Sequence, residues 1–457
     1  MEQPPLCQKD RDNRRRYAIV GTGGRSRMFF DAILGQYSHR AALVGLCDVS
    51  QTRMNYYNGE NRHRFQSPPV PTFLAADFDR MIATTHPDVV IVTTVDCFHH
   101  RYIVRAMELG CDVVTEKPLT IDAEKTRAIL DAVNRTRRNL RVTFNYRYQP
   151  GFGLVKKMVS EGAIGKPTAV DFTWLLDTRH GADYFHRWHR EKDKSGGLLI
   201  HKASHHFDLI NWWINSFPHC VFCMGELKFY GRRNAADRGE SYSYERYTNV
   251  PAAKDDPFAI FLDQEPTLKG LYLDAEADSK YLRDRNVMGE PITIEDTVAL
   301  TARYRNGVIL NYSLLAYSPW EGVRVRISGT KGQLEFSEHH NSHIITGQSD
   351  EELAAEQNKE GESILVIHPM FGKPQRLTIP RGDGAHSGGD AGVLERIFNP
   401  DAPEDPLGRD ATHIDGAASV LMGIAANLSI ERGEAVNCDL VVPLPLDSES
   451  SATLIDA

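Results

Sequence analysis

The feature that most constrains how this chain can fold is an alternation of short apolar runs with longer helix-like segments, from Tyr17 to about Phe144. The runs are apolar throughout instead of at every second position, which is typical of parallel strands covered by helices on both faces. The expected strands are residues 17–21, 42–48, 89–94, 111–116 and 140–145. The segment therefore predicts a doubly wound α/β domain, with its ligand site at the carboxyl ends of the strands.

The pattern changes after Arg147. Residues 297–317 and 322–336 alternate apolar and polar side chains, which predicts an antiparallel sheet with helices on one face. The other face needs cover, so we expect a homo-oligomer, a dimer or a tetramer. The polar stretch 231–291 predicts long loops that serve as lids or binding loops. For 457 residues we expect two domains. These are residues 1–148, in which 1–16 form a tail, and residues 149–457.

The charge and composition of the chain argue against several classes of partner. A net charge of -8 and a pI near 6.1 disfavour broad contacts with phosphates, so we expect small-molecule ligands and no nucleic acid. No apolar run approaches the ~18 residues that cross a membrane, and the beginning of the chain lacks the apolar core of a signal peptide. The 7 cysteines lie mostly in apolar runs and fit a reducing compartment, so the expected location is the cytoplasm.

A glycine-rich turn follows the first expected strand. Gly21, Gly23 and Gly24 let the backbone approach a phosphate, and the following helix offers free N–H groups. Ser26 replaces the third glycine of the usual pattern, which costs little if helix and strand pack slightly less tightly. Asp48 ends the second strand, where a carboxylate accepts hydrogen bonds from the ribose of NAD and repels the 2′-phosphate of NADP. This order of elements favours a Rossmann-type NAD site over an ordinary turn.

The fifth expected strand ends in Glu116, Lys117 and Pro118, at the carboxyl edge of the sheet. A partly desolvated lysine beside a nicotinamide loses some preference for its charged form and can donate to a substrate oxygen as charge develops. Pro118 limits the conformations of the residue before it and so helps to aim the ammonium. Lys117 is therefore a candidate catalytic group. A surface lysine paired with Glu116 is the alternative.

Glu116-Lys117-Pro118, together with residues 93–114, is similar to the glucose–fructose oxidoreductase, inositol dehydrogenase and MocA (Gfo/Idh/MocA) family. The similarity continues through residues 145–150, 162–167 and 196–209 to about residue 440. The resemblance implies a Rossmann domain, then an α/β domain with a large, mostly antiparallel sheet. It also implies a dehydrogenase that acts on a CH–OH group of a carbohydrate with NAD.

Cofactor contacts are expected at the glycine turn and at the ends of three strands of the Rossmann domain. The expected cofactor-binding residues are Gly21, Thr22, Gly23, Gly24, Arg25, Ser26, Asp48, Thr94, Asp96, His99, Glu116 and Lys117.

Residues 198–214 predict one helix after a glycine turn, with His201, His205 and Asp208 on one face. The resemblance implies that His205 is the catalytic base, which takes the hydroxyl proton as hydride leaves. The family usually has an aspartate four residues earlier, where this chain has His201, followed by Lys202. A second imidazole cannot orient the first by negative charge. We therefore expect His201 to contact a substrate oxygen, such as that of a carboxylate, together with Lys202, and we include it among the catalytic candidates.

Aromatic rings and forked donors are concentrated in residues 177–197. Such side chains suit a polyhydroxylated ring, because they stack on its C–H face and bind its hydroxyls. The candidate substrate-binding residues are Lys117, Arg147, Arg179, His180, Tyr184, Trp188, His201, Lys202 and His205. His386 could close the pocket from the second domain, although with Asp390 it equally describes a helix start.

These residues predict reversible oxidation of a secondary hydroxyl of a sugar, inositol or glycoside, in which Lys117 stabilises the oxyanion. One alternative is a redox-neutral enzyme, in which retained NAD oxidises a sugar carbon transiently and the ketone promotes elimination before re-reduction. Another is a non-catalytic NAD-binding regulator, which would not need both Lys117 and His205. Two histidines at helical spacing plus a carboxylate could also ligate zinc or manganese, but hydride transfer needs no Lewis acid and we expect no metal.

Overall fold

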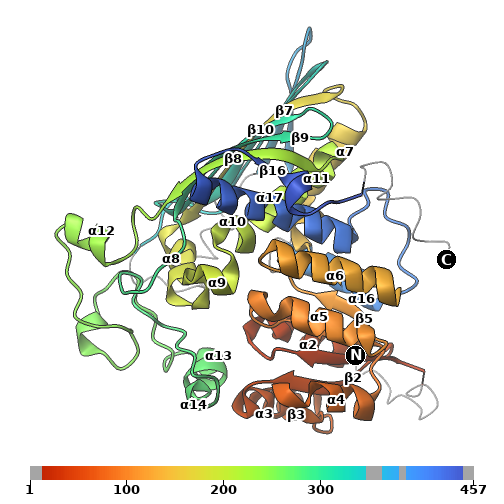
Figure 1. Cartoon of the computed structure of the whole chain (residues 1–457), viewed down its shortest axis with the longest axis vertical. Coiled ribbons are helices and arrows are strands. Elements are labelled where there is room, and N and C mark those ends of the chain that lie inside the picture. The colour runs from red at the N-terminus through yellow and green to blue at the C-terminus, as the bar shows by residue number, and fades with distance from the viewer. Residues whose placement is uncertain (1–12, 346–362, 380–387, 446–457) are drawn as a thin grey trace.

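Two β-sheets organise the chain in the computed structural model, which describes residues 13–345, 363–379 and 388–445. A seven-stranded sheet A lies in the N-terminal half of the molecule and a nine-stranded sheet B in the other half (Figure 1). His386 and residues 1–12 of the expected tail lie outside the described residues.

Sheet A confirms the predicted doubly wound domain. Its strand order is β15-β6-β5-β4-β1-β2-β3, and all pairs are parallel except the one that β15 makes with β6. The strands are β1 (Arg15–Val20), β2 (Ala41–Asp48), β3 (Thr72–Leu74), β4 (Val89–Val92), β5 (Asp112–Thr115), β6 (Leu140–Val142) and β15 (Ala411–Thr412).

Helices cover both faces of sheet A, as strands without polar positions require. Alternate residues of the fully buried β4 enter different apolar clusters, Val90 and Val92 with one set of helices and Val89 and Ile91 with the other. The first set is α4 (Phe78–Thr85), α5 (His99–Glu108) and α6 (Ala123–Thr136), and the second is α2 (Arg27–Leu34), α3 (Gln51–Glu60) and α16 (Gly389–Phe398).

Two strands of the first domain, β3 and β15, are not predicted by the sequence, and one of its helices comes from the late part of the chain. Strand β3 is three residues long, and β15 and α16 come from the late part of the chain. Strand β15 pairs with β6, and α16 packs beside α2. The sequence places all residues after 148 in the second domain, whereas these two elements belong structurally to the first.

Sheet B is antiparallel except for the pair β7–β10, in the order β14-β13-β12-β11-β7-β10-β9-β8-β16. Strand β9 alternates buried and exposed residues along its length, which confirms the predicted period of two. The strands are β7 (Pro167–Asp177), β8 (Pro218–Glu226), β9 (Thr297–Tyr304), β10 (Ile309–Ser318), β11 (Gly322–Gly329), β12 (Gly332–His339), β13 (Ser363–Pro369), β14 (Gln375–Ile379) and β16 (Val436–Asn437).

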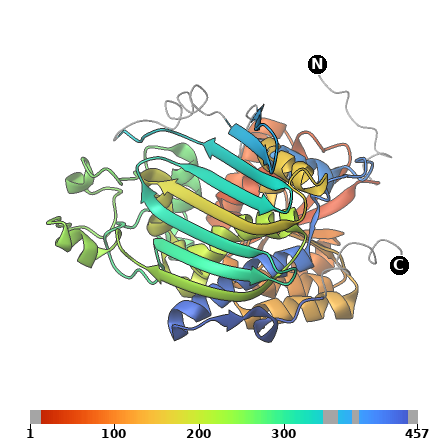
Figure 2. The ribbon, with the colours of Figure 1, turned by 90° about the horizontal axis from the view of Figure 1, so that it is seen from above.

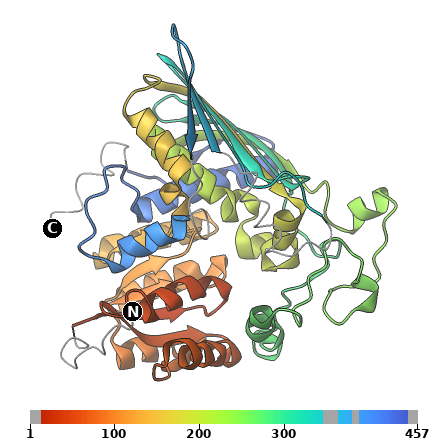
Figure 3. The ribbon, with the colours of Figure 1, turned by 180° about the vertical axis from the view of Figure 1, so that it is seen from behind.

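Helices cover only the inner face of sheet B, the face toward sheet A (Figure 3). They are α7 (Pro150–Ser160), α8 (Thr178–His186), α9 (Lys192–Ser195), α10 (Leu198–His201), α11 (Ala203–Ile214), α17 (His413–Arg432) and α18 (Cys438–Val441). The stretch 231–291 carries short helical turns, α12 (Arg232–Asp237), α13 (Pro266–Leu268), η8 (Lys269–Leu273) and α14 (Glu276–Ser279).

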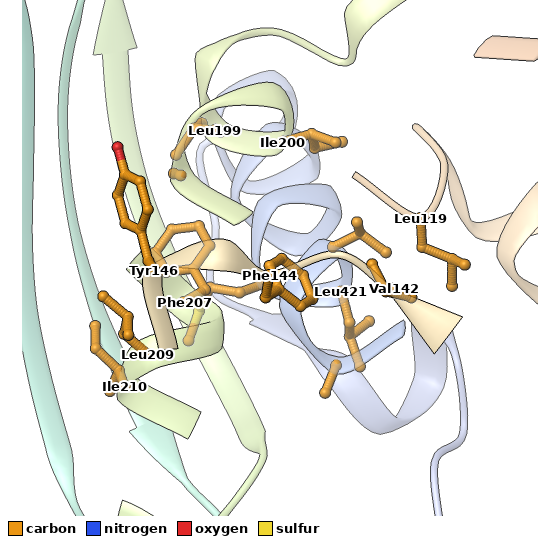
Figure 4. Packing of buried hydrophobic residues seen from close by; sticks show 14 of the residues in the cluster. Leu119, Val142, Phe144, Tyr146, Leu199, Ile200, Phe207, Leu209, Ile210 and Leu421 are labelled. Carbon is orange, nitrogen blue, oxygen red and sulfur yellow. The ribbon is translucent and has the colours of Figure 1, made fainter. Parts of the chain in front are cut away.

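Helix α17 lies between the two sheets and contacts β6 on one side and β8 on the other. At Gly423 a Cβ would lie 2.4 Å from the Leu199 carbonyl oxygen, so only glycine allows this approach. Figure 4 shows side chains of α10, α11 and α17 in one apolar cluster with Val142 and Phe144. By length and composition α17 is the one described helix that could cross a membrane, yet 67% of its most apolar window is buried inside the protein. It is thus the central core helix.

A buried ion pair fixes the start of the second domain. Arg147, in the short turn η5 (Asn145–Tyr148), donates to both carboxylate oxygens of Asp208 at 2.6 and 2.8 Å and to Asp415 at 2.9 Å. The expected role of Arg147 in substrate binding is therefore wrong, because its guanidinium is buried and engaged by α11 and α17. The expected shared face of His201, His205 and Asp208 is also wrong, since Asp208 points to Arg147.

Arg147→Met should lower the free energy of unfolding by about 3–5 kcal/mol, because it leaves Asp208 buried without its counter-charge. Chemical denaturation measures the change. Arg326→Met, which removes an exposed pair with Asp171, is the matched control and should cost at most about 1 kcal/mol. Equal effects of the two substitutions would contradict the structural role of Arg147.

No helix or loop of the described residues covers the outer face of sheet B (Figure 2). Stretch 231–291 extends to one side of the sheet and does not cover this face. We therefore expect light scattering at micromolar concentration to give a mass of at least twice the 51.4 kDa of one chain. A monomer under these conditions would contradict the expectation.

Candidate active site

One cavity of about 810 Å³ lies at the carboxyl ends of the sheet A strands and reaches the elements α8 to α11. Ligands of doubly wound sheets bind at this edge. Most of the residues expected from sequence line it. They are Gly21, Gly23, Gly24, Arg25, Asp48, Thr94, Asp96, His99, Glu116, Lys117, His180, Tyr184, Trp188, His201, Lys202 and His205.

The glycine turn fits a dinucleotide. Gly21 has φ +90°, and a Cβ there would lie 2.6 Å from the backbone nitrogen of Thr94. The backbone N–H of Gly24 donates to the Tyr272 hydroxyl oxygen at 2.9 Å, so it points out of the turn, and a phosphate oxygen there would replace this hydroxyl. These observations match the requirement of a pyrophosphate for close, hydrogen-bonding backbone.

Asp48 is held at the adenosine side of this turn. Its carboxylate accepts from the backbone N–H groups of Thr22 at 2.5 Å and Ser50 at 2.9 Å, and Arg53 lies 3.5 Å away. Thr22 and Ser26 do not line the cavity, contrary to expectation, because their hydroxyls are used inside the turn. That of Thr22 bonds Asp48, and that of Ser26 bonds the Gly23 carbonyl.

His99 orients the strand end that carries Lys117. Its Nδ1 lies 2.8 Å from the Pro118 carbonyl oxygen and its Nε2 lies 3.1 Å from the Thr94 carbonyl oxygen. Burial lowers the pKa of His99, so the neutral ring has one N–H, which can bond only one of these two carbonyls. His99 lines the cavity, as expected for a residue at the cofactor.

Glu116 is paired before any ligand binds. Arg25 donates to it at 2.8 Å and to Asp390 of α16 at 3.1 Å. The expected cofactor-binding pair Arg25 and Glu116 therefore lies at the cavity wall as part of one ion-pair network. The alternative for Lys117, a surface lysine paired with Glu116, is wrong, because Glu116 pairs with Arg25.

Lys117, His201 and Asp96 form a hydrogen-bonded chain across the two domains. Lys117 Nζ donates to the His201 carbonyl oxygen at 3.1 Å and lies 3.3 Å from His201 Nε2. His201 Nδ1 lies 2.5 Å from Asp96 Oδ2. Asp96, expected at the cofactor, thus supplies His201 with the carboxylate that sequence alone could not place.

Burial sets the protonation states in this chain. Burial lowers the pKa of Lys117 to about 8, although the Asp96 and Glu116 carboxylates oppose the change. Burial raises the pKa of Asp96 well above its usual range, and burial with the Lys117 charge lowers that of His201 well below its own. His201 is therefore neutral, and one proton is shared between its Nδ1 and Asp96. Lys117 can hold or release a proton near neutral pH.

The predicted single helix is interrupted at Lys202, where α10 ends and α11 begins. His205, in the first turn of α11, is buried and lines the cavity. Its ring stacks on Tyr146 with centroids 4.1 Å apart and meets Phe144 edge to face. These contacts fix the plane of the imidazole that the family resemblance makes the base.

The segment before α9 supplies a second histidine with a carboxylate partner. His180 Nδ1 lies 2.9 Å from the buried Glu321, and its Nε2 lies 3.2 Å from the Tyr184 hydroxyl. Glu321 was not a sequence candidate, because nothing local marks it. Arg179 is exposed and does not line the cavity, so its expected contact with substrate is wrong for this conformation.

Among the described residues no group of three or more His, Cys, Asp or Glu side chains is arranged to hold a metal ion. Of the metal set considered from sequence, His205 stacks on Tyr146, and the Asp208 carboxylate is already bound by Arg147.

The two halves of the chain match two parts of one protein family. Residues 15–144 match the NAD-binding Rossmann fold of the Gfo/Idh/MocA oxidoreductases, and residues 156–437 match their C-terminal alpha/beta domain. The chain belongs to this family. The resemblance and the fold class expected from sequence are thereby confirmed.

Curated relatives and solved structures agree with this assignment. YteT of Bacillus subtilis, which carries the name of an oxidoreductase, is 33% identical over 413 residues, 86% of this chain and 90% of its own. Inositol 2-dehydrogenase of Rhizobium meliloti is 31% identical over 203 residues, 44% of this chain and 56% of its own. The WlbA dehydrogenase of Bordetella pertussis, solved with NADH and UDP-GlcNAcA, shares the fold at 17% identity, with a TM-score of 0.59 over 95% of this chain and 99% of its own.

Lys117 should titrate near pH 8, protonated below that value and neutral above it, because burial disfavours the ammonium. Reductive ¹³C-methylation followed by an NMR titration measures the pKa. Loss of one resonance in Lys117→Met assigns the signal. A titration near the ordinary lysine value of ~10.4 would contradict the desolvated site.

Proposed function

We propose that this NAD-binding oxidoreductase oxidises a secondary hydroxyl of a sugar, inositol or glycoside. The observation that carries the proposal is the Lys117–His201–Asp96 chain, which opens on the same cavity as the glycine turn. Relatives named as inositol dehydrogenases support the substrate class. We also keep the cytoplasm as the expected location.

Each polar group has a distinct task in this reaction. Bound NAD supplies the hydride acceptor. His205 takes the hydroxyl proton, and the Lys117 ammonium donates to the same oxygen as negative charge develops on it. The His201 carbonyl oxygen accepts from Lys117 and keeps that ammonium in place, while Asp96 fixes the ring through Nδ1. The aromatic wall of Tyr184 and Trp188 suits the C–H face of a sugar ring.

A redox-neutral reaction is the second candidate, and one set of contacts favours it. Asp278, in α14, accepts from the Ser50 hydroxyl at 2.9 Å and from the Thr52 N–H at 3.0 Å, next to Asp48. Arg53 donates to the Leu271 carbonyl at 2.9 Å. These bonds hold part of the predicted lid against the adenosine side of the site, which favours slow release of the cofactor. A retained cofactor suits a reaction that returns the hydride to the substrate.

His205→Asn should lower turnover by ~10²–10⁴-fold with NAD affinity retained, because the base is lost and the Rossmann contacts are not. Lys117→Met should also lower turnover. Absorbance of NADH follows the reaction with inositols and aldoses, and NAD titration follows binding. His219→Asn, at a pair with Asp439 far from the cavity, is the matched control.

Near-full turnover in His205→Asn would show that His205 is not the catalytic base. Product release by the parent protein without accumulation of NADH would favour the redox-neutral reaction.

We further propose NAD as the physiological cofactor, because the Asp48 carboxylate opposes a 2′-phosphate and also partly neutralises Arg53. Fluorescence titration with NADH and NADPH should show tighter binding of NADH. Asp48→Asn should weaken NADH binding by ~1–3 kcal/mol and reduce the difference in affinity between NADH and NADPH. Equal or tighter binding of NADPH by the parent protein would contradict the proposal.

A further inference from the structure

Lys202 is a buried cation at the sugar end of the cavity. Its side chain lies at the junction of α10 and α11, is 2% exposed and lines the cavity wall. The ammonium donates to the Tyr146 hydroxyl at 2.9 Å and lies over the ring of Trp174, 4.5 Å from its centroid. Hydroxyl and ring stabilise the charge but do not neutralise it.

No carboxylate within the described part of the chain lies within 4.0 Å of Lys202 Nζ. Lys194, another lysine of the cavity wall, does have such a partner, Glu191 at 2.7 Å. A buried ammonium without a counter-charge costs free energy, and a protein keeps one where a ligand supplies the charge or where it acts on the ligand.

Charges of both signs surround Lys202: burial and, less strongly, the Glu321 and Glu338 carboxylates raise the pKa of the Tyr146 phenol that Lys202 bonds. Arg187 lines the same end of the cavity, and the carboxylate that it contacts, Asp183, is shared with a second guanidinium, Arg283, at 2.5 Å each. Lys117 is the third cation there. Asp96, the buried acid facing them, has a pKa raised by burial and shares a proton with His201, so it neutralises little.

We propose that Lys202 binds a carboxylate of the substrate, so that the hydroxyl to be oxidised belongs to a sugar acid. The inference rests on the proposed function and narrows its substrate class. The carboxylate takes the place of the missing counter-charge at Lys202 Nζ. Tyr184 adds a neutral donor, since burial raises the pKa of its phenol to about 12 and keeps it protonated. The ring of the sugar then extends from Lys202 toward Lys117 and His205.

Of the three cations at this end of the cavity, Arg187 is paired with Asp183 and Lys117 is held by the His201 carbonyl, so Lys202 is the one left for an anion of the ligand. One such ammonium with neutral hydroxyls suits a monoanion better than a phosphate dianion, which is usually met by several cations or by bidentate arginine. A carboxylate is therefore the anion that this site matches.

Isothermal titration of the full-length protein saturated with NADH tests the proposal without turnover. The probes are D-glucuronate and D-galacturonate, each compared with its neutral sugar, D-glucose or D-galactose, and with D-glucose 6-phosphate. We expect the two acids to bind more tightly than the neutral sugars. Lys202→Met should weaken binding of the acids by ~10–100-fold, weaken binding of the neutral sugars much less, and leave NADH binding unchanged.

Lys156→Met is the matched control. Lys156 also lies over a tryptophan ring, that of Trp212 at 5.6 Å, but outside the cavity, so its substitution should leave every Kd unchanged. Acids that bind no better than neutral sugars, or an acid preference that survives in Lys202→Met, would overturn the proposal. Tighter binding of glucose 6-phosphate than of either acid would overturn it in favour of a phosphate.

These outcomes separate the inference from the proposed function. If neutral sugars bind as well as the acids and produce NADH when NAD is supplied, the proposed dehydrogenase reaction stands and the proposed carboxylate site is wrong. If no sugar and no sugar acid binds, both the proposed function and the proposed carboxylate site are wrong.

Discussion

Burial of α17 between the two sheets is the constraint on which the rest of the structure depends. A helix packed against β6 and β8 at once leaves no freedom for the sheets to shift independently. Gly423 lets its backbone approach Leu199, and Gly416 does the same against Val142. The two domains therefore share one apolar core. The walls of the cavity, one from each domain, are rigid with respect to each other because of this packing.

Polar groups placed on this framework are paired across long distances in the chain. Arg147 joins the first turn of the second domain to α11 and α17. Arg25 joins the glycine turn to Glu116 and to α16. Such pairs contribute less to net stability than to specificity of arrangement, because desolvation offsets much of their attraction. In this cavity, Lys202 stands apart from the pattern by having no acidic partner among the described residues.

The sequence predicts best what is local. The glycine turn, Asp48 at a strand end and Lys117 before Pro118 are each defined by residues within a few positions, and all line the cavity as expected. What it could not predict are partners far apart in the chain. Asp96 and His201 are 105 residues apart, and His180 and Glu321 are 141 apart. Strand β15 has two residues and exists only through its pairing with β6, so no period could reveal it. The break at Lys202 was missed because the apolar pattern continues across it.

The hydrogen bond between His201 and Asp96 makes the geometry of the active site depend on how the two domains pack. The imidazole belongs to one domain and the carboxyl group to the other, so their 2.5 Å contact exists only while the shared core keeps its register. A repacking of α17 that moved His201 by about 1 Å would leave both sheets formed and the cofactor turn intact, yet it would break this hydrogen bond. Packing far from the substrate therefore affects the active site. Substitutions in the interior are restricted by the reaction as well as by stability.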